Sequence, residues 1–169
     1  MTMDVLPVYK ASFFLNQKRR DGLRLRVFYA GDHVYTEFQL GDRFQNETGS
    51  AYNGIFFGIM DVLMWYAILM GAKKVCMTKK ITVEFFEPLL CDAPYCAKSK
   101  LTDVQGKDYY VVAWIEDRNG KAYAKVDALF REGKDVNAAD LLRDFDFSET
   151  TPWMTKFFSA FLSEKEGGS

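Results

Sequence analysis

The feature that most constrains this chain is an apolar run over residues 55–70, in which Asp61 is the only charged side chain. A helix that is apolar on every side is either buried in a protein or spans a membrane. A membrane span needs about 20 apolar residues. This run is shorter and carries a carboxylate near its middle. We therefore expect a buried core helix over roughly 52–70, ended by Gly71 as a C-cap, and no stable membrane insertion.

Strand-like alternation flanks this helix on both sides. Residues 23–27 and 34–40 alternate with period two around a turn at 30–33, which predicts a hairpin. Four further strands are expected after the helix, the last two joined by Asn119-Gly120; they lie at about 81–87, 95–103, 109–116 and 122–130. This order predicts an α+β fold in which an antiparallel sheet of about six strands curls around one long apolar helix, with extra terminal helices.

The two ends of the chain have a different character from the centre. We expect an N-terminal segment over residues 1–21, with a helix at 8–20, a single domain over 22–132, a helical extension over 133–163 and a disordered tail over 164–169. Thr151-Pro152 predicts the start of a helix. Trp153, Phe157 and Phe161 then form an apolar stripe. The stripe fits packing on the domain or on a neighbouring subunit, and a membrane-surface helix is the alternative.

Composition narrows the classes of partner. The formal net charge is −1 without a basic excess, which argues against a nucleic-acid surface. The three cysteines, with no signal peptide, favour a reducing compartment, so we expect a cytoplasmic protein. His33 is the only histidine and no CxxC spacing occurs, so we expect neither a metal nor a cofactor.

Asp61 is the main candidate for chemistry. A carboxylate in an apolar run is costly unless it has a partner or a task. It is either a structural group bonded to a neighbouring hydroxyl, or a general base or nucleophile. The unpaired N–H groups at the helix start, on Asn53 and Gly54, suit an oxyanion. Gly54, Gly58 and Asp61 share one helix face, where small residues leave room for a ligand or a partner helix.

The element order and the stretch over residues 46–54 resemble the hotdog thioesterases, and within them the PaaI-like thioesterases of the phenylacetic acid pathway. That family shows an Asn, a Gly three residues on, then His-Gly-Gly, and an acidic residue nine after the His. Asn46, Gly54 and Asp61 match the pattern here. Tyr52 stands in place of the His, and Asn53 in place of the first Gly.

This resemblance covers about residues 22–131 and implies hydrolysis of acyl-CoA thioesters. It implies that Asp61 is the catalytic carboxylate. It adds Asn46, whose amide would hold the carbonyl or a water. It also adds Thr78, whose hydroxyl lies near the attacking water or is a plain surface group. Tyr52 is either a donor to the substrate or a packing aromatic. The candidates for substrate contact are Tyr52, Gly58 and Trp65.

Helix geometry predicts an oligomer. Asn53 and Asp61 are eight residues apart, or about 12 Å along a helix axis. They cannot both touch one thioester carbon, so two antiparallel helices from two subunits are needed, in a homodimer or a dimer of dimers. Two other functions stay open. One is a non-catalytic acyl-CoA or fatty-acyl binding or regulatory hotdog protein, and the other is a dehydratase or hydratase, which would rely on a catalytic His.

Overall fold

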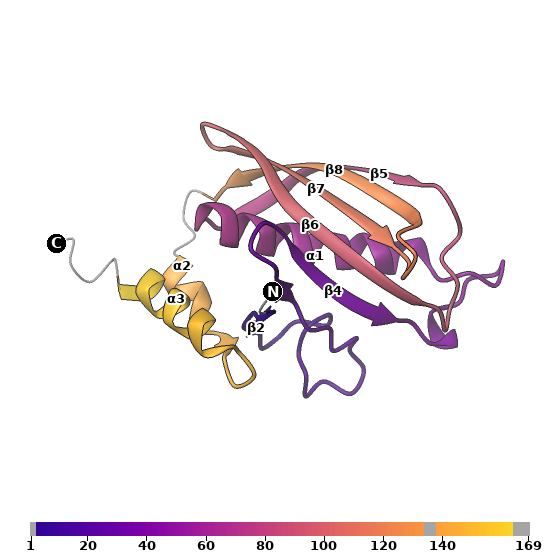
Figure 1. Cartoon of the computed structure of the whole chain (residues 1–169), viewed down its shortest axis with the longest axis horizontal. Helices are drawn as coiled ribbons and strands as arrows, with labels where there is room; N and C mark the ends of the chain where they lie inside the picture. Colours follow the sequence, from indigo (N-terminus) through magenta and orange to yellow (C-terminus); the bar gives the residue numbers. More distant parts are fainter. Residues whose placement is uncertain (1–2, 134–137, 164–169) are drawn as a thin grey trace.

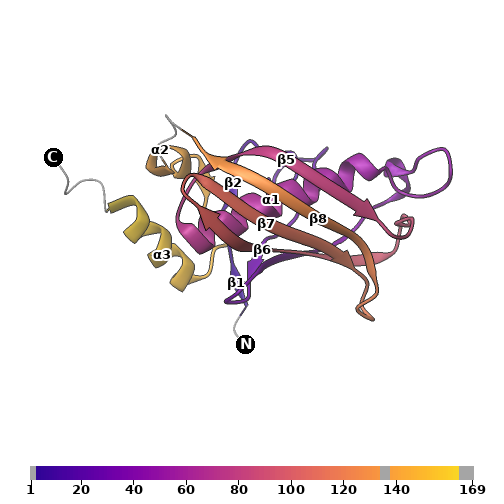
Figure 2. The same ribbon diagram turned by 90° about the horizontal axis from the view of Figure 1, so that it is seen from above.

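The computed structural model describes residues 3–133 and 138–163, and one long helix held in a curved sheet forms its centre (Figure 1). This helix, α1 (Asn53–Ala72), lies against a seven-stranded antiparallel sheet, whose central strands cross it in Figure 2. The predicted α+β architecture is therefore confirmed, with seven strands in the sheet. In spatial order these are β1 (Asp4–Val5), β3 (Phe28–Tyr29), β4 (Val34–Gln39), β6 (Pro94–Gln105), β7 (Asp108–Glu116), β8 (Ala122–Glu132) and β5 (Cys76–Phe85).

The sheet and the terminal segments bury most of α1, which explains why the helix is apolar on every side. Its fully buried side chains include Phe56, Ile59, Met60, Met64, Ile68 and Leu69. Each large apolar side chain removed from water stabilises the fold by about 1.5–3 kcal/mol. Within the described part of the chain, α1 is also the one helix long and apolar enough to cross a membrane. Its position against the sheet accounts for that composition.

The end of α1 differs from the prediction by two residues. Gly71 lies inside the helix, and Lys73 is the C-cap, in the left-handed conformation with φ 54°. The Lys73 N–H donates to the Leu69 carbonyl at 3.0 Å. Gly71 has a packing role instead, because a Cβ at this position would lie 3.1 Å from Leu101 Cδ2 on β6.

The four strands predicted after the helix are all present, as β5 to β8. Every second residue of β7 is buried, in the alternation that a half-buried strand requires. The predicted hairpin between β7 and β8 is confirmed, although only Gly120 of the two turn residues has a positive φ, of 80°. The Asp117 carboxylate accepts hydrogen bonds from the N–H groups of Asn119 and Lys121 and so fixes this turn.

The N-terminal segment departs from the prediction. The expected helix at 8–20 is absent, and this stretch contains the two-residue strand β2 (Val8–Tyr9) followed by turns. The expected strand at 23–27 is irregular, because Arg24 takes a left-handed conformation with φ 53°. Its alternating leucines pack inward, but the N–H groups of Leu23 and Leu25 donate to Phe13 and Phe14 rather than to a strand. The regular strand is β3, which begins just after the predicted range and pairs with β4, so the hairpin has a first strand of only two residues.

The C-terminal part contains α2 (Ala138–Leu142), β9 (Phe145–Asp146) and α3 (Pro152–Ser163). Helix α3 begins at the predicted proline, but the Thr151 hydroxyl accepts a hydrogen bond from Val5 N–H at 2.6 Å. The predicted stripe packs only in part. Trp153 is 54% exposed, whereas Phe157 is partly buried against the core beside the buried Met154 and Phe158. The side chain of Phe161 lies outside the described residues. Residues 164–169, expected to be disordered, lie outside the described residues.

Candidate active site

Asp61 and Thr78, two of the predicted site residues, meet between α1 and β5. Thr78 Oγ1 donates a hydrogen bond of 2.8 Å to Asp61 Oδ1. Asp61 is half-buried in the middle of α1, and Thr78 is exposed on β5, next to a bulge in its pairing with β8. Among the described residues, Thr78 is the one hydrogen-bond partner of this carboxylate. This hydrogen bond fits both a structural and a catalytic role of Asp61, and the surroundings of the pair distinguish the two roles.

A largely apolar cavity of about 250 Å³ opens beside this pair. Four of its lining side chains are buried: Leu15, Tyr66, Phe130 and Phe145. The predicted contact residue Trp65 lines it as well. A mostly apolar cavity with a few polar groups at one place is typical of a small-molecule site. Asp61 and Thr78 therefore stand where a ligand with an apolar body and one reactive polar group would present that group.

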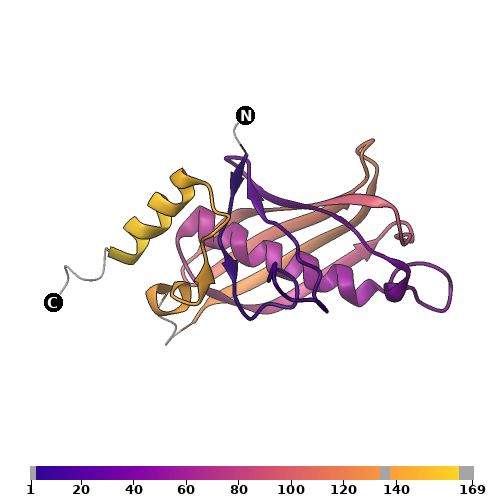
Figure 3. The ribbon, with the colours of Figure 1, turned by 90° about the horizontal axis from the view of Figure 1, so that it is seen from below.

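Part of the wall of this cavity comes from the two ends of the chain. Tyr9 on β2 and Phe145 on β9 both line it, and they are register partners in the two-stranded sheet that β2 and β9 form. Figure 3 shows the N-terminal segment and α2 on the side of α1 that the large sheet leaves open. The amino-acid sequence does not reveal these residues as part of a site, because a pairing between segments so far apart leaves no local pattern.

One residue of the apolar run, Tyr66, indicates in the sequence that another segment must pack on α1. Tyr66 is the only phenol within the apolar run of α1, and a buried tyrosine hydroxyl usually needs a hydrogen-bond partner. Its hydroxyl donates to the Pro7 carbonyl at 2.7 Å. Burial raises the pKa of Tyr66, so the phenol stays protonated and remains a donor. This buried hydrogen bond attaches the N-terminal segment to α1 next to the cavity.

Gly58 has a close neighbour within the chain. A Cβ at this position would lie only 2.2 Å from Phe14 Cζ. The space that the glycine leaves on α1 is thus filled by an aromatic ring of the N-terminal segment. Beside Gly54, by contrast, an added Cβ would meet no atom within 4 Å.

The start of α1 lies apart from the cavity. Tyr52, Asn53 and Gly54 are exposed, Tyr52 by 57%, and none of them lines the cavity. Tyr52 is the N-cap residue and makes no side-chain cap hydrogen bond. In the described part of the chain, the N–H groups of Asn53 and Gly54 have no protein acceptor. These amides are available to a ligand or to another subunit.

Asn46 organises the loop that leads into α1. Its Oδ1 accepts hydrogen bonds from Thr48 N–H at 2.9 Å and from Ser50 N–H at 3.2 Å, and its Nδ2 donates to Ser50 Oγ at 2.9 Å. The structure therefore gives Asn46 a role in holding the loop before the helix. Its predicted contact with substrate stays a prediction.

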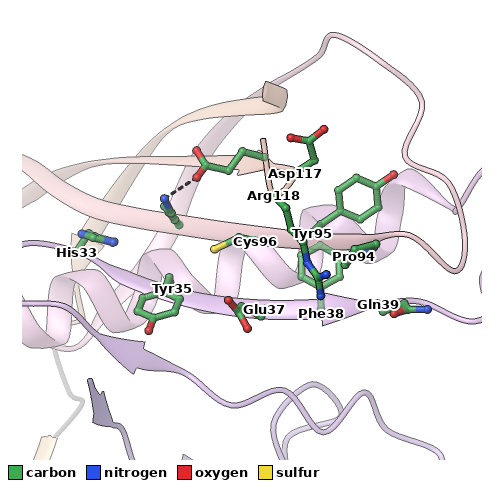
Figure 4. A pocket seen from close by; sticks show the side chains of 12 residues that line it. His33, Tyr35, Glu37, Phe38, Gln39, Pro94, Tyr95, Cys96, Asp117 and Arg118 are labelled. Carbon is green, nitrogen blue, oxygen red and sulfur yellow. Dashed lines mark hydrogen bonds and ion pairs between the residues drawn. The ribbon is translucent and has the colours of Figure 1, made fainter. Parts of the chain in front are cut away.

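A wider hollow, of about 640 Å³, lies on the sheet beside β4 and β6 (Figure 4). Charged side chains surround it, including Glu37, Asp117 and Arg118. Lys98 and Glu116 form an ion pair of 2.5 Å at its edge. Cys96 also lines it, but burial raises the pKa of its thiol to about 11, so this cysteine is protonated at neutral pH and a weak nucleophile. This hollow lacks the Asp61–Thr78 pair, and its lining is mostly polar, whereas that of the cavity beside Asp61 is mostly apolar.

The remaining candidates for chemistry are few. Across residues 3–133 and 138–163, no group of three or more His, Cys, Asp or Glu side chains is placed to hold a metal ion. Cys76 is free and buried, and burial raises the pKa of its thiol to about 12. His33 bonds to Asp32 at 2.7 Å and lines the hollow on the sheet instead of the cavity. A dehydratase-like histidine and acid pair is therefore not formed with Asp61.

Solved structures of similar shape share this architecture. A thioesterase superfamily protein aligns with a TM-score of 0.69 and 18% identity over 73% of this chain, but over only 61% of its own length. The E. coli PaaI protein, from the phenylacetic acid degradation operon, aligns with a TM-score of 0.60 and 14% identity over 65% of this chain and 84% of its own. A Streptococcus mutans protein bound to acetyl-CoA aligns with a TM-score of 0.57 and 14% identity, over 62% and 84%.

No protein-family model and no curated protein matches the sequence. At these identities the structural likeness establishes the fold, and the chain has the hotdog fold of thioesterase superfamily proteins that include PaaI. The resemblance predicted from residues 22–131 is confirmed at that level.

Proposed function

We propose that this chain is an acyl-CoA thioesterase whose active sites form between two subunits. The observation that carries the proposal is the Asp61–Thr78 pair, at 2.8 Å, set at the edge of an apolar cavity of about 250 Å³. The fold supports it, because a protein of the same fold binds acetyl-CoA. The three cysteines are free thiols, which suits a reducing compartment, and we place the enzyme in the cytoplasm.

The chemistry divides between the two parts of α1. Asp61 takes a proton from a water molecule, and the water oxygen attacks the thioester carbonyl carbon. The carbonyl oxygen then carries negative charge, which the backbone N–H groups of Asn53 or Gly54 stabilise at the positive end of the helix dipole. The C–S bond breaks, and the coenzyme A sulfur leaves with the proton that Asp61 had accepted. Direct attack by the Asp61 carboxylate is the alternative first step.

A second copy of the chain completes each site in this proposal. β5 is an edge strand of ten residues, and an unpaired edge of this length readily adds another strand. Met77 on β5 and Phe57 on α1 are 57% and 43% exposed, so apolar surface is available to a partner. Two β5 strands joined about a two-fold axis would set the two α1 helices antiparallel. Asp61 of one subunit would then face the helix start of the other.

Replacing Asp61 tests this function most directly. Asp61→Asn keeps the size of the side chain and removes the base, so kcat should fall by about 10²- to 10⁴-fold. A panel of aryl and alkyl acyl-CoA thioesters, followed by release of free thiol, measures the effect. Asp127→Asn, at an exposed carboxylate on β8, is the matched control and should leave kcat unchanged. Full activity of Asp61→Asn would remove Asp61 from its proposed role.

A second candidate is a non-catalytic acyl-CoA binding or regulatory protein. The observation that favours it is Tyr52, which replaces the histidine of the family pattern and points no group into the cavity of its own chain. This candidate predicts that acyl-CoA binds to the wild-type chain and to Asp61→Asn alike, with no thiol released by either.

A further inference from the structure

The cavity beside Asp61 is partly built by segments that lie outside the unit of helix and large sheet. Leu15 and Tyr9 come from the N-terminal segment, and Leu141 and Phe145 from the C-terminal part. The β2–β9 pairing, the Lys10 N–H bond to the Asp144 carbonyl at 3.0 Å, and the Tyr66 bond to Pro7 join these segments to each other and to α1. This wall is therefore held by backbone and buried hydrogen bonds, not by side-chain contact alone.

We propose that these terminal segments set the size of the acyl group, with Phe145 as the residue that limits it. The inference rests on the proposed thioesterase function and adds the substrate class: acyl groups of short to medium length are accepted and long-chain fatty acyl groups are not. The thioester carbonyl lies at Asp61 and Thr78, and the acyl body extends between α1 and the terminal segments.

The volume of the cavity supports this limit. A cavity of about 150 Å³ in a protein holds one benzene molecule. A half-open cavity of about 250 Å³ therefore has room for one ring with a short linker, or for an alkyl chain of about eight carbons. A chain of about sixteen carbons has nearly twice that volume, so half of its apolar surface would remain in water.

Phe145 is the best placed residue to set this limit. Its side chain is 5% exposed and lines the cavity. Its ring stacks on Trp65, with centroids 6.0 Å apart and planes 22° apart, and meets Tyr66 edge-on at 6.4 Å. The backbone of β9 is paired with β2 on its other side. The ring is thus fixed from two directions and cannot move aside for a longer chain without breaking these contacts.

A chain-length series tests the proposal. The full-length chain and its variants are assayed with acetyl-, hexanoyl-, octanoyl-, lauroyl-, palmitoyl- and phenylacetyl-CoA. For the wild type, kcat/KM should be at least tenfold higher with octanoyl- than with palmitoyl-CoA. Phe145→Ala enlarges the cavity and should shift the acyl chain length with the highest kcat/KM to chains longer by about two to four carbons. Val62→Phe narrows the cavity from the α1 side and should shift the preferred acyl chain to a shorter length.

The control keeps the result interpretable. Phe158→Leu changes a ring that is also buried, with 0% exposure, but lies on α3 outside the cavity, and it should leave the length profile unchanged. Phe145→Leu serves where Phe145→Ala does not fold, as judged by thermal unfolding. A wild-type profile flat from hexanoyl to palmitoyl, or Phe145 variants with the wild-type profile, would overturn the proposal.

Binding of the free carboxylic acids of the same series, measured by calorimetry, separates this inference from the proposed function. If no thioester is hydrolysed but the acids bind with a length limit that Phe145→Ala relaxes, the size limit stands and the thioesterase function fails. If thioesters are hydrolysed and neither turnover nor acid binding depends on length, the function stands and the size limit fails. If the acids do not bind and nothing is hydrolysed, both are wrong.

Discussion

The start and the middle of α1 differ sharply in their surroundings, although only eight residues separate Asn53 from Asp61. The start is exposed and follows a polar loop, and its amides have no acceptor in the described part of the chain. The middle is half-buried, with its carboxylate bonded to Thr78 beside an apolar cavity. Each place offers what the other lacks, an anion-binding amide or a proton acceptor. One helix thus carries two half sites that its own length keeps apart.

Removing a single backbone amide from the start of α1 should lower kcat more than any change to the Thr78–Asp61 hydrogen bond or to the loop before the helix. Asn53→Pro deletes the N–H at the first helical position, where proline is well tolerated. Tyr52 before it is already extended, with φ −63° and ψ 124°, as a residue preceding proline prefers. We expect kcat for acyl-CoA to fall by about 10²- to 10³-fold, with little change in Tm.

Asn53→Ala is the matched control, since it removes the side chain and keeps the N–H. Its kcat should stay close to that of the wild type. Equal activity of the proline and alanine variants would exclude the Asn53 amide as the oxyanion donor and leave that role to Gly54.

Mixing two inactive variants should restore one complete active site, made of the helix start of one subunit and the carboxylate of the other. Asp61→Ala and Asn53→Pro subunits, co-expressed in equal amounts, form mixed dimers in which one site has both defects and the other has none. Activity should recover to about a quarter of the wild-type value, because half of the dimers are mixed and each has one intact site. Thiol release by the purified mixture measures it. No recovery in dimers shown to be mixed would place both half sites in one subunit.

Removing the hydrogen bond between Thr78 and Asp61, at the middle of α1, should lower kcat by a smaller factor. Thr78→Val keeps the shape and removes the donor to Asp61. A hydrogen bond to a charged group is worth about 1.5–3 kcal/mol, so a loss of at least tenfold in kcat is expected. Thr78→Ser retains the hydroxyl and should retain most of the activity. A fully active Thr78→Val would show that Asp61 needs no partner to hold its orientation.

A change in the loop before the start of α1 should lower kcat the least. Asn46→Ala removes the acceptor for the Thr48 and Ser50 amides, and the free energy of unfolding should fall by about 1–2 kcal/mol. Urea unfolding measures this change, and we expect kcat to fall only a few-fold. A loss of activity as large as that of Asn53→Pro, without a change in stability, would instead place the Asn46 side chain in contact with substrate.

The central helix and most strands of the large sheet could be predicted from the sequence, because each of them has a local hydrophobic pattern. An apolar run predicts α1, and alternation predicts β5 to β8. The same alternation misled at residues 23–27, where Leu25 and Val27 are buried as in a strand but Arg24 breaks the extended backbone. Burial of every second side chain does not require a neighbouring strand.

The candidate site was only partly predictable. Asp61 stood out as a lone charge, and Thr78 came from the family resemblance; the structure joins the two. The cavity beside them was not foreseen, because Tyr9 and Phe145 meet through the pairing of β2 with β9. Strands of two residues have no periodicity to detect, and their pairing depends on where the rest of the chain places them.

Gly58 and Phe14 occupy, in effect, one shared volume divided between two distant stretches of chain. A side chain added at 58 would overlap the Phe14 ring, at 2.2 Å, so neither position can change size freely while the other stays as it is. In orthologues we expect substitutions at the two places to be correlated, with alanine or serine at 58 accompanied by a smaller residue at 14. Such covariation would show, from sequences alone, which orthologues keep the N-terminal segment packed on α1.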